Sequence, residues 1–280
     1  MILDGKKVAE EMKQELKELI AAFVKIYQRP PSLTIISVGD DPASKIYVRN
    51  KIKAAEEVGI EVDHLCFDAD GGEFLIREVI CHRNLNPKVD GIMVQLPLPQ
   101  GYNEREIIDT ICPWKDVDGL TTTNIGRLRS GQPCLKPCTA AGIIDLCKYY
   151  NIELDGKDVT IVGRSNIVGK PLADLMMAEG ATVMQCHSKT RYLADYTLYA
   201  DIVISAIGKP KYFDAKYFGS DQTVIDVGIN RDEDGKLCGD IDFEDVRIGV
   251  DNITPVPGGV GPMTVVELLK NTLEAAYNNV

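Results

Sequence analysis

The sequence of 280 residues has few of the features that mark membrane, secreted or metal-binding proteins. Its longest apolar runs, such as GIMVQLPLP and DIVISAIG, fall well short of the roughly 20 residues that a membrane-spanning helix needs. The first residues, MILDGKKVAEEMKQELKEL, lack the basic start, the apolar stretch and the cleavage site of a secretory signal. We therefore expect a cytoplasmic protein with no membrane partner.

Histidine is also scarce, and the 31 lysines and arginines are outnumbered by 42 acidic residues. The three histidines and eight scattered cysteines form no paired zinc pattern, so we expect reduced thiols and no metal site. A net charge of -11 repels polyanions and disfavours nucleic acid as a partner. Within this acidic chain the segment 44–53, SKIYVRNKIK, is locally basic. Two interpretations of it stay open: a solvated helix face, and a cleft that collects an anionic small molecule.

The chain contains two successive series of predicted strands and helices. In the first series we expect helices over residues 8–24, 42–59 and 73–84, and strands over 33–38, 60–67 and 91–99. In the second we expect strands over 158–163, 181–186, 201–208 and 223–230, and helices over 170–179 and 261–277. Strands that alternate with helices predict parallel sheets.

The length of the chain and its two series predict an α/β protein with two α/β domains and a cleft between them. Residues 1–120, together with the C-terminal helix 262–280, are expected to form one domain. Residues 140–261 are expected to form the other, a Rossmann-type nucleotide-binding domain.

The nucleotide site is predicted in the segment DVTIVGRSNIVGKP, where a glycine-containing turn joins a strand to a helix. Gly163 and Gly169 would let the backbone approach a pyrophosphate, and the helix N-terminus would supply free amides. The pattern alone is weak, and an ordinary strand-to-helix turn is the alternative. The next strand ends in CHSKTR, without the acidic residue that binds the ribose in NAD sites. Arg164 and Ser188 suit a 2′-phosphate, which favours NADP over NAD.

A second pattern pairs Tyr47 with Lys51, one turn apart on one face of the helix that Asp41 and Pro42 begin. A Tyr-x-x-x-Lys pair is typical of short-chain dehydrogenases, where it follows the nucleotide motif within a single domain. Here it precedes that motif and belongs to the other series, so this family fits poorly. A packing tyrosine and an exposed helical lysine are the alternatives for the two residues.

Six segments, in this order along the chain, resemble the signatures of the methylenetetrahydrofolate dehydrogenase/methenyltetrahydrofolate cyclohydrolase family. They are DDPASKIYVRNK, VQLPLP, KDVDGL, VGRSNIVGKP, CHSKT and ITPVPGGVGPMT. The resemblance implies an enzyme that binds tetrahydrofolate derivatives, oxidises 5,10-methylenetetrahydrofolate with NADP⁺ and hydrolyses the 5,10-methenyl product to 10-formyltetrahydrofolate. It also implies a homodimer, for which the segment RYLADYTLYA is our candidate interface.

The resemblance also implies roles for single residues. The four catalytic positions become Lys51, Tyr47, Gln95 and Asp118. Among them Gln95 is the hydrogen-bond partner of the lysine, and Asp118 is the aspartate that binds the pterin. Contact with the substrate is also expected of Tyr47, Gln95 and Asp118. The loop expected to close on the folate contains Pro257, Gly258, Gly259 and Pro262. The expected cofactor contacts are Gly163, Arg164, Ser165, Gly169, Ser188 and Ile229. Lys45 and Glu267 occupy positions where no fixed residue is expected.

These roles make chemical sense for the hydrolysis step. Water must attack the methenyl carbon, a proton must move and one C–N bond must break, and a lysine can assist only while its amine is neutral part of the time. Gln95 is a polar amide at the end of a buried strand, which is costly unless the amide is paired. Two other hypotheses stay open: an NADP dehydrogenase for a hydroxy acid such as shikimate, and an NADP-binding sensor without chemistry.

Overall fold

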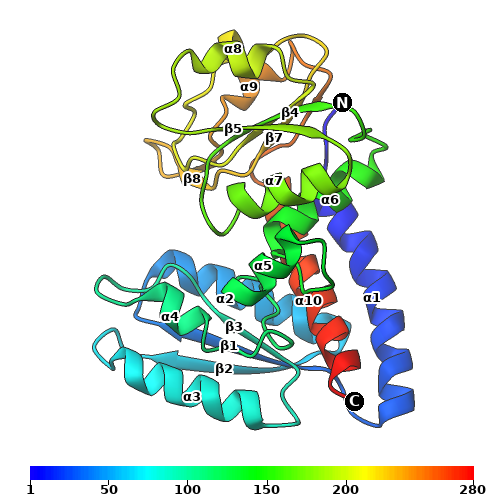
Figure 1. The fold of residues 1–280 in the computed structure, drawn as a ribbon, viewed down its shortest axis with the longest axis vertical. Coiled ribbons are helices and arrows are strands. Elements are labelled where there is room, and N and C mark those ends of the chain that lie inside the picture. Colours follow the sequence, from blue (N-terminus) through cyan, green and yellow to red (C-terminus); the bar gives the residue numbers. More distant parts are fainter. The chain divides into compact units, whose positions relative to one another are not determined.

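The computed structural model covers residues 1–280, apart from the side chain of Ala43. By their internal contacts the residues form two compact units, whose elements are labelled in Figure 1. The five-stranded unit contains Met1–Glu10 and Thr139–Thr264, and the three-stranded unit contains Glu11–Cys138 and Val265–Val280. The helices α1 (Gly5–Tyr27), α6 (Cys138–Tyr149) and α10 (Val260–Asn278) each contain residues of both units.

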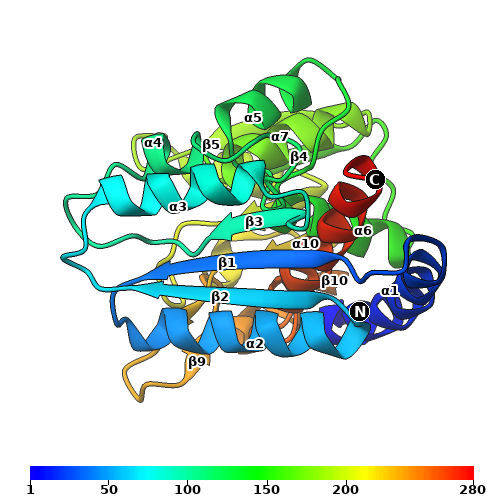
Figure 2. The ribbon, with the colours of Figure 1, turned by 90° about the horizontal axis from the view of Figure 1, so that it is seen from below.

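The three-stranded unit has a parallel sheet with the strand order β2-β1-β3. Its strands are β1 (Ser32–Val38), β2 (Glu61–Phe67) and β3 (Gly91–Val94). The connecting helices α2 (Pro42–Val58) and α3 (Glu73–Leu85) lie on opposite faces of this sheet (Figure 2). A core of aliphatic side chains from the sheet and from α3 contains Ile36, Ile76, Ile80 and Ile92, together with Ile107 from a later segment.

Local signals explain the bounds of α2. The carboxylate of Asp41 accepts a hydrogen bond from Ser44 N at 2.7 Å and so caps the first turn. Gly59 ends the helix in the left-handed region, with φ of 94°, where a residue without a side chain is favoured. The prediction of this helix is confirmed to within one residue at its C-terminal end.

The strand expected over residues 91–99 is shorter than predicted. β3 ends at Val94, and Gln95 N makes one more strand-like hydrogen bond, to Ile36 O at 2.8 Å. The prolines 97 and 99 that follow carry no N–H to donate to a neighbouring strand. Two short helices that the sequence patterns did not predict come next, α4 (Glu104–Ile108) and α5 (Thr122–Arg129).

The five-stranded unit has a parallel sheet with the order β10-β7-β6-β4-β5. Its strands are β4 (Asp158–Val162), β5 (Thr182–Cys186), β6 (Ile202–Ser205), β7 (Thr223–Asp226) and β10 (Asn252–Ile253). The chain leaves β4 on one side toward β5 and then crosses to β6 on the other side. Such a switch in strand order marks where doubly wound sheets bind ligands, just outside the carboxyl ends of the strands.

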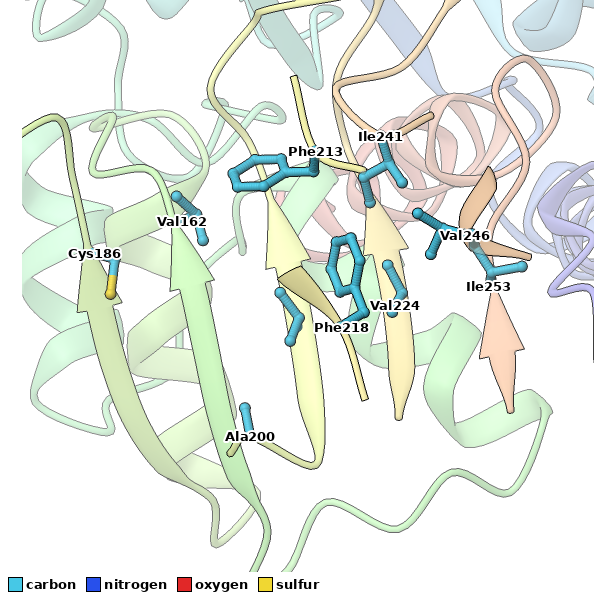
Figure 3. Packing of buried hydrophobic residues seen from close by; sticks show 10 residues of the cluster. Val162, Cys186, Ala200, Phe213, Phe218, Val224, Ile241, Val246 and Ile253 are labelled. Atoms are coloured by element: carbon cyan, nitrogen blue, oxygen red, sulfur yellow. The ribbon is translucent and has the colours of Figure 1, made fainter. Parts of the chain in front are cut away.

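The remaining elements of this unit connect the strands. They are α7 (Gly169–Ala178), α8 (Leu193–Leu198), a 3₁₀ turn η1 (Ala215–Tyr217), the antiparallel pair β8 (Asn230–Arg231) and β9 (Leu237–Cys238), and α9 (Phe243–Val246). Figure 3 shows the core on this sheet, where Phe213 and Phe218 lie among aliphatic side chains from the strands. The two rings are 6.2 Å apart between centroids. The predicted α/β class with parallel sheets is confirmed.

Every cysteine that the structure describes is a free thiol. Among the described residues no His, Cys, Asp and Glu side chains gather in a group of three that could hold a metal ion. None of the helices described is both long enough and apolar enough to cross a membrane.

Candidate active site

Lys51 and Gln95 form a direct contact within the three-stranded unit. Lys51 Nζ, on α2, donates a hydrogen bond of 3.0 Å to Gln95 Oε1, just beyond β3. The amide nitrogen of Gln95 donates to Leu96 O at 2.6 Å. Because the amide NH₂ group is used by the backbone, the amide oxygen is the atom that faces the lysine. The structure thus brings the two side chains together, while their catalytic roles stay predictions.

Tyr47 lies one turn before Lys51 on α2. It is 37% exposed, whereas Val48 and Ala55, three residues before Lys51 and four after it, are buried in the core. Lys51 therefore borders the buried face of α2, and Tyr47 lies one turn away, where a flat ring and an amine can both reach one ligand.

A buried thiol connects Asp118 to this pair. Cys138 Sγ donates to Val117 O at 3.2 Å. Burial raises the pKa of the Cys138 thiol well above its ordinary value, the charges of Asp118 and Glu267 raise it further, and the charge of Lys51 lowers it. The half-buried carboxyl of Asp118 also forms a hydrogen bond with this thiol, which raises its pKa as well. That Asp118 and Lys51 serve one ligand stays a prediction.

The neighbouring Asp116 is committed to the structure of the loop. It is 1% exposed, and its Oδ2 accepts hydrogen bonds from Thr121 N at 2.7 Å and from Asn124 Nδ2 at 2.9 Å. Burial raises the pKa of this carboxyl, while the hydrogen bonds from Thr121 and Asn124 oppose the shift. Of the two aspartates in DVDG, only Asp118 is thus left available for a ligand.

The C-terminal helix supplies residues that sequence patterns did not single out. Glu267, expected to have no fixed role, is 2% exposed and forms an ion pair of 3.4 Å with Lys270. Asn271 Nδ2 donates to Val117 O and to Lys136 O, both at 2.9 Å, and so holds the backbone next to Asp118. The available signal was a carboxylate and an amide on the apolar face of the helix pattern TVVELLKNTL.

The nucleotide turn lies in the five-stranded unit and is packed tightly on itself. Gly163 has φ of 139°, and a Cβ atom there would lie 2.4 Å from Ala206 O. A Cβ atom on Gly169 would lie 2.3 Å from Gly163 O. Ser165 Oγ accepts hydrogen bonds from Val168 N at 3.1 Å and from Gly169 N at 3.4 Å. A cradle that only glycine permits, at the start of α7, fits a pyrophosphate.

The donors expected to contact the rest of the cofactor lie at the same edge of the sheet. Val162 at the end of β4 pairs with Cys186 at the end of β5, so Arg164 and Ser188 follow adjacent strand ends. Both side chains are exposed, and a guanidinium and a hydroxyl are donors that suit a phosphate ester. Ile229, which follows β7, is 46% exposed. The residues present therefore fit NADP.

The loop expected to close on the folate belongs to the five-stranded unit. Pro257 follows a cis peptide bond and is exposed. The carbonyl of Gly258 accepts a hydrogen bond from Lys6 N at 2.9 Å, and a Cβ atom on Gly259 would lie 2.5 Å from Pro255 O. Pro262 follows within the first turn of α10. The expected folate contacts of this loop stay predictions.

The basic segment on α2 divides into two parts. Lys45 is exposed and forms an ion pair with Asp40, which supports its interpretation as a solvated residue. Arg49 and Lys53 are also exposed. Lys51 is half-buried, and of the four cations in this segment it is the one that contacts Gln95.

Asp226, the buried last residue of β7, predicts that the stability of the protein depends on pH. Burial raises the pKa of Asp226 from 3.8 to about 7, against backbone donors from Gly228, Asp240 and Ile241. The folded protein therefore keeps a proton that the unfolded chain loses near pH 4. This contribution to the free energy of unfolding is fully present below pH 4 and is lost as the pH rises through 7. The loss between pH 5 and pH 8 is on the order of 3 kcal/mol.

Urea denaturation at pH 5 and pH 8 checks this, with Asp226→Asn as the non-titrating comparison. Between the two pH values the wild type should lose stability relative to the variant. A difference between the two proteins that stays constant with pH would contradict the prediction.

Both halves of the chain match models of one family. Residues 3–118 match the catalytic domain of tetrahydrofolate dehydrogenase/cyclohydrolase, and residues 137–280 match its NAD(P)-binding domain. A curated relative, the bifunctional protein FolD of Streptococcus thermophilus, is 47% identical over 279 residues, which cover 100% of this chain and 98% of the relative.

Solved structures give the same result. The bifunctional methylenetetrahydrofolate dehydrogenase/cyclohydrolase FolD from Campylobacter jejuni superposes with a TM-score of 0.97 at 43% identity, covering 100% of this chain and 99% of that one. The FolD of Trypanosoma brucei, solved with NADP cofactor and an inhibitor, has a TM-score of 0.95 at 36% identity, with coverage of 99% and 97%.

Proposed function

The chain belongs to the tetrahydrofolate dehydrogenase/cyclohydrolase family, and from this premise we propose how its own residues carry out the two reactions. The protein oxidises 5,10-methylenetetrahydrofolate to 5,10-methenyltetrahydrofolate with NADP⁺ and hydrolyses the product to 10-formyltetrahydrofolate. It is an oxidoreductase and a hydrolase of one-carbon metabolism. The observation that carries the assignment of residues is the hydrogen bond between Lys51 Nζ and Gln95 Oε1.

The oxidation step requires positioning more than acid-base chemistry. NADP⁺ supplies the hydride acceptor when bound, and the folate nitrogens stabilise the cation that forms. Asp118 accepts hydrogen bonds from the amide and amino groups of the pterin. Tyr47 holds the ring from α2. We assign folate binding to residues 1–120 with 262–280, and NADP binding to residues 140–261.

The hydrolysis step makes greater use of Lys51. Water attacks the methenyl carbon, and the amine of Lys51 takes part in the proton transfer that precedes cleavage of one C–N bond. Gln95 orients this amine through a neutral oxygen, which fixes its position without adding a negative charge beside it. A carboxylate at the same place would hold the lysine as a permanent cation and oppose the transfer.

Membership in the family disfavours both other hypotheses. The matches cover the catalytic domain as well as the nucleotide domain, whereas a hydroxy-acid dehydrogenase would share only the general architecture. A sensor without chemistry would have no use for the Lys51–Gln95 contact beside Asp118.

A spectroscopic assay of the purified protein tests the function. With 5,10-methylenetetrahydrofolate and NADP⁺, the near-ultraviolet absorbance of NADPH should grow, and the band of the methenyl intermediate should rise and then decay. With 5,10-methenyltetrahydrofolate alone, that band should decay without cofactor. If neither the NADPH signal nor the change in the methenyl band is seen with either substrate, the assignment is wrong.

We also propose that the protein is a homodimer. The segment 191–200 contains α8 and exposes three tyrosines, of which Tyr192 is 79% and Tyr199 is 84% exposed. Large exposed aromatic side chains are typical of protein interfaces. Sedimentation velocity at micromolar concentration should give a dimer whose dissociation constant rises when Tyr199 is replaced by aspartate. A monomer at all concentrations would contradict the proposal.

A further inference from the structure

Two buried carboxylates in the five-stranded unit have no part in the steps described above. Asp226 ends β7 and is 3% exposed, and Asp240 follows β9 and is 0% exposed. Burying a carboxylate is costly unless hydrogen bonds replace its water. The hydrogen-bond partners of the two side chains therefore indicate which segments of the fold these carboxylates stabilise.

Asp240 accepts four hydrogen bonds, most of them from segments that follow strands. Its Oδ2 accepts from Ile207 N at 2.7 Å and from Ser205 Oγ at 2.9 Å. Its Oδ1 accepts from Lys209 N at 2.8 Å and from Asn230 Nδ2 at 2.9 Å. One side chain thus joins the end of β6, the segment after it, and the segment after β7.

Asp226 holds the backbone around Asp240. It accepts from Gly228 N at 2.9 Å, from Asp240 N at 3.0 Å and from Ile241 N at 2.9 Å. Glycines leave room for both carboxylates. A Cβ atom on Gly228 would lie 2.3 Å from Asp240 Oδ1, and one on Gly239 would lie 1.8 Å from Asp226 Oδ2.

The segments that these carboxylates hold lie at the carboxyl ends of the strands, where the nucleotide turn also lies. Ala206, one residue before Ile207, places its carbonyl against Gly163, where a Cβ atom would lie 2.4 Å away. Ile229 lies between Gly228 and Asn230, two residues whose N–H groups bond to the carboxylates. The network therefore holds the residue that follows Ala206, which supports the nucleotide turn, and the two residues on either side of Ile229, which is expected to contact the cofactor.

We propose that Asp240, held in place by Asp226, is a positioning residue for NADP. It fixes residues 206–209 against the nucleotide turn and fixes Gly228–Asn230 so that Ile229 faces the cofactor. This inference rests on the proposed function, because it takes NADP as the ligand of this edge. Because both carboxylates are buried, the proposal gives neither of them a direct part in the reactions.

A carboxylate is required because the surrounding groups all donate. Asparagine at position 240 would keep one acceptor oxygen and place an NH₂ group against two donors. The donors of Ile207 and Lys209 cannot then both be satisfied, and the segments they belong to would shift away from the nucleotide turn.

Isothermal titration calorimetry with NADP⁺ tests the proposal in the Asp240→Asn variant of the full chain. The dissociation constant for NADP⁺ should rise about ten- to a hundredfold. Steady-state kinetics should show the same effect on the cofactor. The KM for NADP⁺ should rise, and kcat at saturating NADP⁺ should fall by a smaller factor. The rate of methenyl hydrolysis without cofactor should stay within about twofold of the wild type.

Asp90→Asn is the matched control. Asp90 is also 0% exposed and also accepts four hydrogen bonds, two from Arg29, one from Ser32 N and one from Asn279 Nδ2, but it lies in the three-stranded unit. Its replacement should lower the unfolding temperature and leave the dissociation constant for NADP⁺ unchanged. A purely structural Asp240 would give the same result as this control.

Ser205→Ala covers the case in which Asp240→Asn does not fold. It removes one of the four donors to Asp240 and should raise the dissociation constant by about threefold. Unchanged NADP⁺ binding in a folded Asp240→Asn protein, or in Ser205→Ala if the first does not fold, overturns the proposal. If the wild type itself neither binds NADP⁺ nor forms NADPH, the proposed function fails instead.

Discussion

Replacing Lys51 with glutamine should reduce hydrolysis of 5,10-methenyltetrahydrofolate by about 10²–10⁴-fold and leave oxidation of 5,10-methylenetetrahydrofolate largely intact. Glutamine can still form a hydrogen bond with Gln95, but it cannot accept or release a proton. Hydride transfer needs no proton from the lysine, because the redox chemistry belongs to the cofactor and the folate nitrogens. Following the methenyl band with and without NADP⁺ measures the two steps separately.

Lys53→Gln is the matched control for this variant. Lys53 lies on the same helix, two residues further along, and is exposed. The change in charge is the same, so both activities should stay within about twofold of the wild type. Undiminished hydrolysis in Lys51→Gln would remove the lysine from the mechanism, and equal loss of both activities would indicate that it serves folate binding instead.

Replacing Arg164 with alanine should raise the KM for NADP⁺ about ten- to a hundredfold and leave the KM for NAD⁺ nearly unchanged. The Arg164 side chain is exposed and follows the end of β4. Ser188 follows the end of the neighbouring strand β5. The Arg164 guanidinium would hold the 2′-phosphate through charge-assisted hydrogen bonds, and NAD⁺ has no such phosphate. Initial rates of NADPH and NADH formation at varied cofactor concentration give both constants.

Arg247→Ala removes the same charge from the same unit and serves as the control. Arg247 is exposed, follows α9 directly and is paired with Glu244 at 2.7 Å. It should leave both cofactor constants unchanged. Equal constants for the two cofactors in the wild type, unaffected by Arg164→Ala, would refute the assignment of the 2′-phosphate contact.

Much of the fold could be predicted because its signals are local. The cap of Asp41 and the left-handed Gly59 specify α2 within a few residues of chain, and alternating strands and helices indicate parallel sheets. The short helices α4 and α5 were missed, since five and eight residues carry little periodicity. The place of the N-terminus was also hidden. Leu3 N donates to Ile253 O at 2.8 Å, so the first residues extend the sheet beside β10.

The sequence by itself determined the α/β class, the helical spacing of Tyr47 and Lys51, and the glycine turn that begins α7. Each depends on residues within one or two turns of each other, where backbone geometry is set by the side chains at hand. Only the tertiary structure decided that the amide oxygen of Gln95 faces Lys51, 44 positions away, and that Asp240 joins the segments after β6 and β7. Such contacts depend on which strands become neighbours, and that is settled by the burial of the whole sheet.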